Sequence, residues 1–224
     1  MTKRALDIVA SLFAVLVIGP IALLVGAAVK LTSPGPVFFR QERIGRRFRP
    51  FGIYKFRTMV QDAPIRGGTI TVGDDPRITR IGKLLRKSKI DELPQLINVL
   101  KGEMSLVGPR PEAPKYVELF RNDYEEILQV RPGITDLASI EYRDEAAVLG
   151  QARDGERAYT ESVLPEKIRL AKDYVRRASF WFDVKLICRT VASLIGDRLS
   201  ARESPRHRRL DRDGTIESPE RKAA

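Results

Sequence analysis

Residues 88–112 read SKIDELPQLINVLKGEMSLVGPRPE, and the rest of the chain is arranged around this stretch. Asp91 and Glu92 stand side by side at the expected start of a short helix, because Pro94 is tolerated only in a first helical turn. Gly102 is the natural C-terminal cap of that helix. On spacing alone, the favoured interpretation of Asp91 is a plain helix N-cap. A helix N-terminus also suits phosphate, so a metal and phosphate site formed with Gln95 is the competing interpretation.

Basic residues surround this carboxylate pair in the sequence. A short apolar strand, 104–107, leads into Gly108-Pro109-Arg110-Pro111, where two prolines fix the backbone around Arg110. A rigid guanidinium near two carboxylates suits a pyrophosphate. Upstream, Asp75-Pro76 predicts a helix start with an apolar face, and its other faces carry Arg77, Arg80, Lys83, Arg86 and Lys87. A solvated basic face and a phosphate-binding face are equally good interpretations of this ridge.

Composition narrows the class of protein. The chain has 224 residues and a net charge of +11, so we expect anionic partners: nucleic acid, lipid headgroups or phosphorylated small molecules. One cysteine, Cys188, excludes an internal disulfide framework and a cysteine-rich zinc site. The single histidine, His207, lies in a polar tail, which argues against a Ser-His-Asp triad or a histidine-ligated metal. The chemistry must then use carboxylates, lysines, arginines, hydroxyls and a hard cation.

The N-terminal stretch 5–31 is the most apolar part of the chain, with no charged residue from Ile8 to Val29. Roughly 20 apolar residues suffice to cross a bilayer as a helix. Gly19-Pro20 at its centre predicts a sharp bend. Lysines and arginines lie on both flanks, and positive residues prefer the cytoplasmic side. We therefore favour a re-entrant helix broken at Gly19 and Pro20 over a kinked spanning helix, and a buried core helix is the least favoured alternative.

The remaining segments complete the predicted fold. Residues 37–43 and 51–59 are two β-like runs joined by a basic turn. In the second run, Lys55 and Arg57 alternate with aromatic residues. The plain interpretation of these two residues is that they are solvated cations on a hairpin. Residues 164–195 are an amphipathic helix or helix pair that either lies in the membrane interface or docks on the core. We expect an α+β, mainly helical fold in three parts. Residues 1–32 form a re-entrant membrane helix, and residues 197–224 form a disordered polar tail. Residues 33–196 form a cytoplasmic-face catalytic domain that contains the small hairpin, the catalytic helices and an amphipathic interfacial helix.

Seven blocks of this chain, in order, resemble the bacterial sugar transferases, the monotopic phosphoglycosyl transferases. They are Lys3–Asp7, Ser33–Gly45, Tyr54–Met59, Asp74–Gly82, Asp91–Gln95, Gly108–Pro111 and Arg131–Thr135. Each block alone is weak, but the series is highly specific. The resemblance implies transfer of a sugar phosphate from a UDP-sugar to polyprenol phosphate, with Mg²⁺ as cofactor, at the cytoplasmic face of a bacterial inner membrane.

The resemblance also implies roles for individual residues. Asp91 matches the family's nucleophilic aspartate, Glu92 the metal-supporting glutamate, and both are the implied metal ligands. The phosphate-binding arginines look like Arg86 and Arg110. Further candidates for substrate and phosphate binding are Lys55, Arg57, Arg77, Arg80 and Gln95.

The sequence departs from the common family pattern after Thr135, which puts the sugar specificity in doubt. The chain resembles the short form of the family, without extra N-terminal membrane helices. The expected partners are the UDP-sugar, polyprenol phosphate and the lipid bilayer. Whether a second copy of the chain is also a partner, in a homodimer, is left open. The alternative function is a non-catalytic, basic, membrane-associated scaffold. A nucleic-acid binder is disfavoured, because no basic recognition helix or aromatic RNA motif is present.

Overall fold

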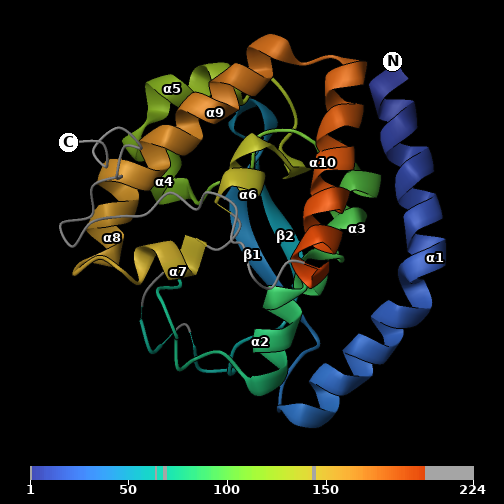
Figure 1. Cartoon of the computed structure of the whole chain (residues 1–224), viewed down its shortest axis with the longest axis vertical. Coiled ribbons are helices and arrows are strands. Elements are labelled where there is room, and N and C mark those ends of the chain that lie inside the picture. The colour runs from blue at the N-terminus through green and yellow to red at the C-terminus, as the bar shows by residue number, and fades with distance from the viewer. Residues whose placement is uncertain (1, 64, 68–69, 143–144, 200–224) are drawn as a thin grey trace.

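A computed structural model of the chain describes residues 2–63, 65–67, 70–142 and 145–199. Within these residues the protein is mainly helical and carries two small two-stranded sheets, which confirms the predicted α+β, mainly helical class (Figure 1). The longer elements are α1 (Thr2–Thr32), β1 (Phe38–Ile44), β2 (Pro50–Phe56), α2 (Arg80–Lys87), α3 (Gln95–Lys101), α9 (Leu164–Arg177) and α10 (Phe180–Leu199). The shorter ones are η1 (Arg46–Phe48), η2 (Ile90–Glu92), β3 (Ser105–Val107), α4 (Pro114–Leu119), α5 (Arg121–Ile127), β4 (Gly133–Thr135), α6 (Leu137–Glu141), α7 (Glu145–Leu149), α8 (Gly155–Ala158) and η3 (Tyr159–Val163).

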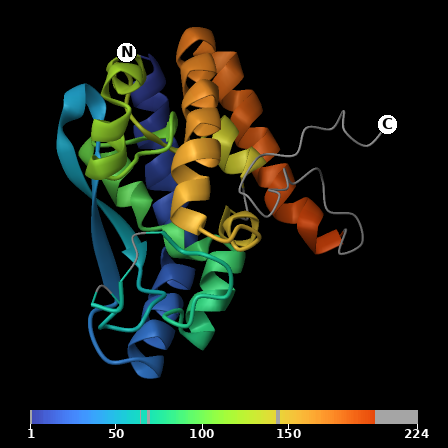
Figure 2. The same ribbon diagram turned by 90° about the vertical axis from the view of Figure 1, so that its left-hand side faces the viewer.

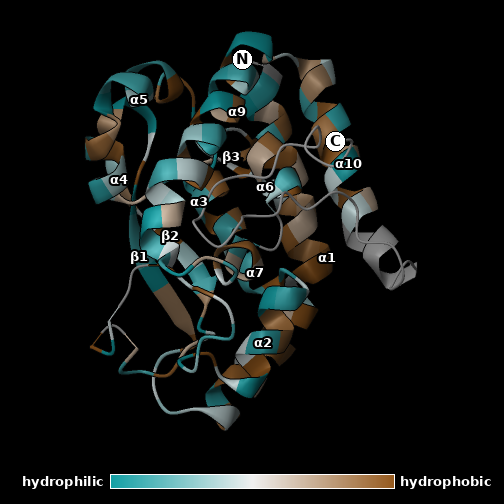
Figure 3. Ribbon diagram, turned by 60° about the vertical axis from the view of Figure 1, so that its left-hand side comes forward, coloured by the Kyte–Doolittle hydropathy of each residue, from teal (hydrophilic) through white to brown (hydrophobic). Residues whose placement is uncertain are grey.

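Helix α1 runs along one side of the molecule and contains Pro20. Figure 1 shows the helix changing direction about halfway along, as expected where a proline removes one backbone hydrogen bond. Its apolar side chains point outward: Phe13 is 68% exposed and Leu16 78% exposed. Figure 3 shows α1 coloured mostly as hydrophobic, and Figure 1 shows it at the edge of the fold. By length and composition, α1 is the one helix of the described residues that could cross a membrane.

Polar side chains fasten the first two turns of α1 to the domain. The buried carboxylate of Asp7 accepts hydrogen bonds from the Ser105 hydroxyl (2.9 Å) and the Leu106 main-chain nitrogen (3.1 Å), at the start of β3. The guanidinium of Arg4 donates to the Leu100 carbonyl (3.1 Å), where α3 ends and its carbonyls need donors. The end of α3 and the start of β3 are thereby held at fixed positions around one end of α1.

The other end of α1 is fastened to the hairpin and to α2. Val29 is fully buried in a small core with Phe56 and Leu85. Arg57, the residue after β2, donates to the main-chain and hydroxyl oxygens of Ser33, both at 2.7 Å. Both ends of the apolar helix are therefore attached to the same domain.

The predicted hairpin is present. Strands β1 and β2 pair antiparallel, with Phe38 opposite Phe56 and Ile44 opposite Pro50. The basic turn between them is the 3₁₀ segment η1, in which Arg47 is left-handed (φ 58°). Figure 2 shows this hairpin along one side of the molecule and α10 toward the other.

Helix α2 begins later than the sequence predicts. Asp75 does not cap a helix; its carboxylate accepts from the main-chain nitrogen of Arg77 (2.9 Å) and from the Arg77 guanidinium (2.6 Å). The cap is Thr79, whose hydroxyl accepts from the Gly82 nitrogen at 3.0 Å. The pairing of Asp75 with Arg77 and a β-bridge between Met59 and Ile78 hold residues 75–78 out of the helix.

Strands β3 and β4 form a parallel pair next to the carboxylate stretch. Gly108, just after β3, lies very close to the backbone of Gly133, the first residue of β4. A Cβ on Gly133 would lie 2.1 Å from the Gly108 nitrogen, so glycine is required at this crossing. The main hydrophobic core is formed by buried side chains of α4, α5, α8 and α9, among others.

The predicted helix pair of residues 164–195 is present as α9 and α10. Helix α10 buries Asp183 and Leu186 and leaves Trp181 77% exposed. Cys188 and Val191 of this helix are also exposed. The predicted polar tail lies, from residue 200 on, outside the described residues.

Candidate active site

Asp91 is the middle residue of η2 and its side chain is buried, with 6% of the residue exposed. Its Oδ1 atom is fully buried and has no hydrogen-bond partner in the described structure. Asp91 caps no helix, since the N-cap position of η2 is Lys89 and that of α3 is Pro94. The plain interpretation of Asp91 as a helix cap is therefore wrong. A buried carboxylate oxygen without a partner is expensive, and such atoms in native proteins call for a functional explanation.

The charges around Asp91 act on its proton affinity in opposite directions. Burial raises the pKa of Asp91 above its usual value, and Glu92 adds to this effect. Lys55, Arg86 and Lys89 oppose it by favouring the charged form. These five side chains and Arg110 form a unit that we call the Asp91 cluster: Lys55, Arg86, Lys89, Asp91, Glu92 and Arg110.

Glu92 is the fully paired carboxylate of the cluster. Its Oε1 accepts from Lys55 at 3.1 Å, and its two oxygens together accept from both terminal nitrogens of Arg110. Burial alone would raise the pKa of Glu92, but Arg110 and Lys55 outweigh it and hold the pKa well below its usual value. Glu92 thus stays ionised and fixes two cations beside Asp91.

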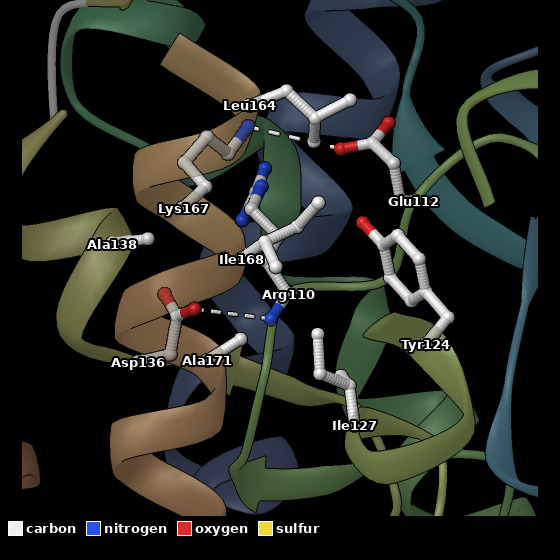
Figure 4. Close-up of a pocket in the computed structure, with 10 residues that line it drawn as sticks. All are labelled: Arg110, Glu112, Tyr124, Ile127, Asp136, Ala138, Leu164, Lys167, Ile168 and Ala171. Atoms are coloured by element: carbon white, nitrogen blue, oxygen red, sulfur yellow. Dashed lines mark hydrogen bonds and ion pairs between the residues drawn. The ribbon is translucent and has the colours of Figure 1, made fainter. Parts of the chain in front are cut away.

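Arg110 is positioned from its backbone as well as from its side chain. The prolines on either side restrict its main chain, and its own nitrogen donates to Asp136 at 3.0 Å. Pairing with Glu92 raises the pKa of Arg110. Behind it lies a small cavity of about 10 Å³, large enough for about one water molecule, which Arg110, Tyr124 and Lys167 help to line (Figure 4).

Arg86 projects from the last turn of α2 toward the same carboxylates. Its Nε donates to the Thr58 hydroxyl at 2.8 Å and its Nη1 to the Thr71 hydroxyl at 3.0 Å. Burial lowers the pKa of Arg86, against the opposing effect of Asp91. These two threonines were not found from the sequence, because nothing in their local pattern indicates a role.

Four other predicted substrate-binding residues are not members of the Asp91 cluster. Arg57 is buried against Ser33 and so holds the hairpin to the end of α1. Arg77 is paired with Asp75. Arg80 is exposed at the start of α2 and, within the described residues, makes no hydrogen bond or ion pair. Gln95 is fully buried one turn after Asp91, and neither end of its amide has a partner there.

Lys89 belongs to the cluster but sequence reasoning missed it. Its backbone is left-handed, with φ 57° and ψ 14°. That conformation places the lysine beside the carboxylates, and it has no sequence signal, because glycine and asparagine are the residues that normally adopt it.

The fit of a divalent cation can be tested on the carboxylates themselves. Among the described residues, no group of three or more His, Cys, Asp or Glu side chains is arranged to hold a metal. Asp91 has a free, buried oxygen, whereas both oxygens of Glu92 are occupied by cations. Mg²⁺ is commonly held by one or two carboxylates together with substrate phosphates. Asp91 with a bound diphosphate fits that pattern.

The chain is similar to known proteins over most of its length. The family model for the bacterial sugar transferases matches residues 1–197. The chain is 42% identical, over 87% of its length, to the UDP-glucose:undecaprenyl-phosphate glucose-1-phosphate transferase of Caulobacter vibrioides, and covers 70% of that protein. It is 42% identical over 85% of its length to the exopolysaccharide production protein PSS of Rhizobium leguminosarum bv. phaseoli, and covers 94% of it.

Other relatives are much longer. The UDP-N-acetylgalactosamine-undecaprenyl-phosphate N-acetylgalactosaminephosphotransferase of Aeromonas hydrophila is 39% identical over 86% of this chain, but the chain spans only 43% of its length. The match of this chain to the family model, over residues 1–197, includes the Asp91 cluster. The chain belongs to the bacterial sugar transferase family.

Proposed function

We propose that this protein transfers a sugar-1-phosphate from a UDP-sugar to undecaprenyl phosphate or a similar polyprenol phosphate, with release of UMP. The names of its relatives supply the substrate classes. The observation that carries the proposal is the buried, unpartnered oxygen of Asp91 inside a cluster of four cations and two carboxylates. The cluster therefore has an excess of two positive charges, which matches the single negative charge on each phosphate of a nucleotide-sugar diphosphate.

The first step uses Asp91 as the nucleophile. One oxygen of its carboxylate attacks the β-phosphorus of the UDP-sugar and forms an acyl phosphate, a mixed anhydride of Asp91 and the sugar phosphate. The bond from that phosphorus to the bridging oxygen breaks, and UMP leaves with the bonding electrons. Arg110, oriented by Glu92, and Arg86, oriented by Thr58 and Thr71, lie where they can neutralise charge that develops on the phosphate oxygens.

The second step regenerates the aspartate. An oxygen of the polyprenol phosphate attacks the phosphorus, the bond to Asp91 breaks, and the lipid diphosphate sugar is released. Neither step needs a histidine base, because both nucleophiles are already oxyanions. Mg²⁺ bound at Asp91, with the diphosphate, would supply further charge neutralisation on the phosphates.

Mass spectrometry of the purified protein tests this route. With a UDP-sugar and no lipid, we expect one phosphosugar added at Asp91 and an equal amount of UMP released. Asp91→Asn should lose both and reduce turnover by about 10³-fold or more. Full turnover by this variant, or UMP release that strictly requires the lipid, would contradict the aspartate intermediate.

We further propose that α1 enters and leaves the membrane on the same, cytoplasmic, side of a bacterial inner membrane. Support comes from its two ends: Asp7 near one end and Ser33 just beyond the other are hydrogen-bonded to parts of one domain, while the residues between expose apolar side chains. Trp181 and Val191, exposed on α10, would lie in the interface. This arrangement would hold the Asp91 cluster at the surface where a lipid phosphate can reach it.

Cysteine labelling tests the topology. In a Cys188→Ser background, Ala5→Cys and Leu31→Cys place one thiol near each end of α1, at exposed positions. A membrane-impermeant maleimide should label both in inverted vesicles and neither in intact spheroplasts. Labelling of the two thiols from opposite sides would establish a spanning helix instead.

A further inference from the structure

Lys89 has an unusual backbone at the edge of the candidate site. It connects α2 to η2 with φ 57° and ψ 14°, a left-handed conformation that residues with a Cβ disfavour. The turn is closed by two hydrogen bonds, from its nitrogen to the Arg86 carbonyl (3.1 Å) and from the Glu92 nitrogen to its carbonyl (3.2 Å). A non-glycine residue held in such a conformation is frequently found where function requires it.

The side chain of Lys89 is partly buried among the charges of the Asp91 cluster. Glu92, Arg110, Asp91 and Lys55 are close enough to affect its proton affinity. Within the described part of the chain, however, its ammonium group makes no hydrogen bond and no ion pair. A partly buried ammonium without a partner is unfavourable unless something else supplies one.

The other cations of the cluster already have partners. Lys55 and Arg110 are both bonded to Glu92, and Arg86 is bonded to two threonine hydroxyls. No oxygen of Glu92 is left without a cation. Lys89 is thus the cation of the cluster that has no partner within the described residues. It lies two residues before the proposed nucleophile.

We propose that Lys89 is a phosphate-binding residue, whose ammonium group binds a phosphate oxygen of an anionic substrate beside Asp91. This inference rests on the proposed function for the identity of that substrate. Two sources present the same chemistry: the diphosphate of the nucleotide sugar and the phosphate of the lipid acceptor. The left-handed turn is the device that places the ammonium there.

Direct binding separates these sources. The affinities of the full-length protein for UDP and for a short-chain polyprenyl phosphate are measured in detergent micelles by titration calorimetry at low and moderate salt. Lys89→Asn removes the charge but tolerates the left-handed backbone, and Lys89→Arg keeps the charge. The matched control is Lys87→Ala, which removes an exposed lysine from the last turn of α2.

We expect Lys89→Asn to weaken binding about 10-fold and to reduce its salt dependence, as loss of a charge-assisted contact should. A defect for UDP alone assigns Lys89 to the donor, a defect for the prenyl phosphate alone assigns it to the acceptor, and defects for both assign it to both. Lys89→Arg should bind within a few-fold of the wild type, and Lys87→Ala within about two-fold.

Two outcomes would overturn the assignment. One is wild-type affinity of Lys89→Asn for both ligands. The other is an equal loss in Lys89→Asn and Lys89→Arg together with a lowered melting temperature, which would make Lys89 a structural residue of the turn. Because binding is measured without turnover, failure of the wild type to release UMP from any UDP-sugar would reject the proposed function and leave the binding result standing.

Discussion

Helix α1 and the Asp91 cluster are opposite exceptions to the usual distribution of side chains. In α1, apolar residues are exposed, with Leu16 at 78% and Leu23 at 77%; in the cluster, a carboxylate is buried, with Asp91 at 6%. Soluble proteins rarely bury unpaired charge or expose a long row of large apolar groups. A partner outside the chain would offset the cost of each exception. For α1 this partner is lipid, and for the cluster it is a phosphorylated substrate.

The two regions are also mechanically connected. Asp7 of α1 is bonded to Ser105 and Leu106 in β3, and β3 leads directly into Arg110. The strand therefore connects the apolar helix to the guanidinium that faces Glu92. In a bilayer, this connection would fix the height of the candidate site above the lipid surface. The following predictions test how far the two regions depend on their partners and on each other.

The largest effect is expected in the cluster. Arg110→Ala leaves the partly buried Glu92 without its bidentate partner, and breaking a buried ion pair from one side costs about 3–5 kcal/mol. We expect this loss in the free energy of unfolding, measured by denaturant titration in detergent, together with loss of UMP release. Arg110→Lys keeps the charge and should recover part of the stability but little activity. An unchanged unfolding midpoint for Arg110→Ala would show that the pairing with Glu92 is not a stable feature of the fold.

The next effect concerns the exposed face of α1. Leu16→Asp places a charge in the middle of the apolar stretch, and an aspartate at the centre of an inserted helix costs about 3 kcal/mol. We expect much of this variant to leave the membrane fraction on sedimentation. The matched control is Leu119→Asp, at an exposed leucine (61%) that ends α4, which lies across the molecule from α1 (Figure 1). Equal loss of both variants from the membrane would mean that α1 is not the membrane-bound face.

A smaller effect is expected where the two regions join. Asp7→Ala leaves the Ser105 hydroxyl and the Leu106 nitrogen buried without an acceptor, which should cost about 2 kcal/mol of stability. Ser11→Ala is the control one turn later, because the Ser11 hydroxyl is buried and has no partner among the residues that the structure describes. Its removal should be close to neutral in the same thermal unfolding assay. If both variants unfold alike, then the contact with β3 contributes little to holding α1.

The sequence predicted these regions to different extents, for physical reasons. Gly102 located the end of α3, and the uncharged run located α1, because both signals are local; α3 itself begins at Gln95, later than the expected start at Asp91. The start of α2 was predicted four residues too early, because the ion pair of Asp75 with Arg77 competes with capping, and that competition depends on geometry. The pairing of Glu92 with both Lys55 and Arg110 joins residues far apart in the chain, so spacing cannot reveal it. The same holds for the left-handed Lys89 and for Thr58 and Thr71 beside Arg86.

The smallest predicted effect distinguishes the two adjacent carboxylates by pH. Because burial raises the pKa of Asp91 in the folded protein, the folded state binds this proton more tightly than the unfolded chain does. Ionised Asp91 therefore destabilises the fold at neutral pH, and this penalty disappears as the pH falls through the folded-state pKa toward the unfolded value. Asp91→Asn, in metal-free buffer, should raise the free energy of unfolding at pH 7 by on the order of 1 kcal/mol, with a gain that shrinks in acid.

Glu92 provides the control with the opposite sign in the same experiment. Its folded-state pKa is lowered, so its contribution to stability is present above the unfolded value and is lost as the pH falls through the folded-state pKa. Glu92→Gln should therefore destabilise the protein at pH 7, and its deficit should also shrink in acid. A site in which one carboxylate strains the fold and its neighbour stabilises it is expected where the first is kept for chemistry. Parallel unfolding curves for the two variants would remove that distinction, and with it the main physical reason for choosing Asp91 over Glu92 as the nucleophile.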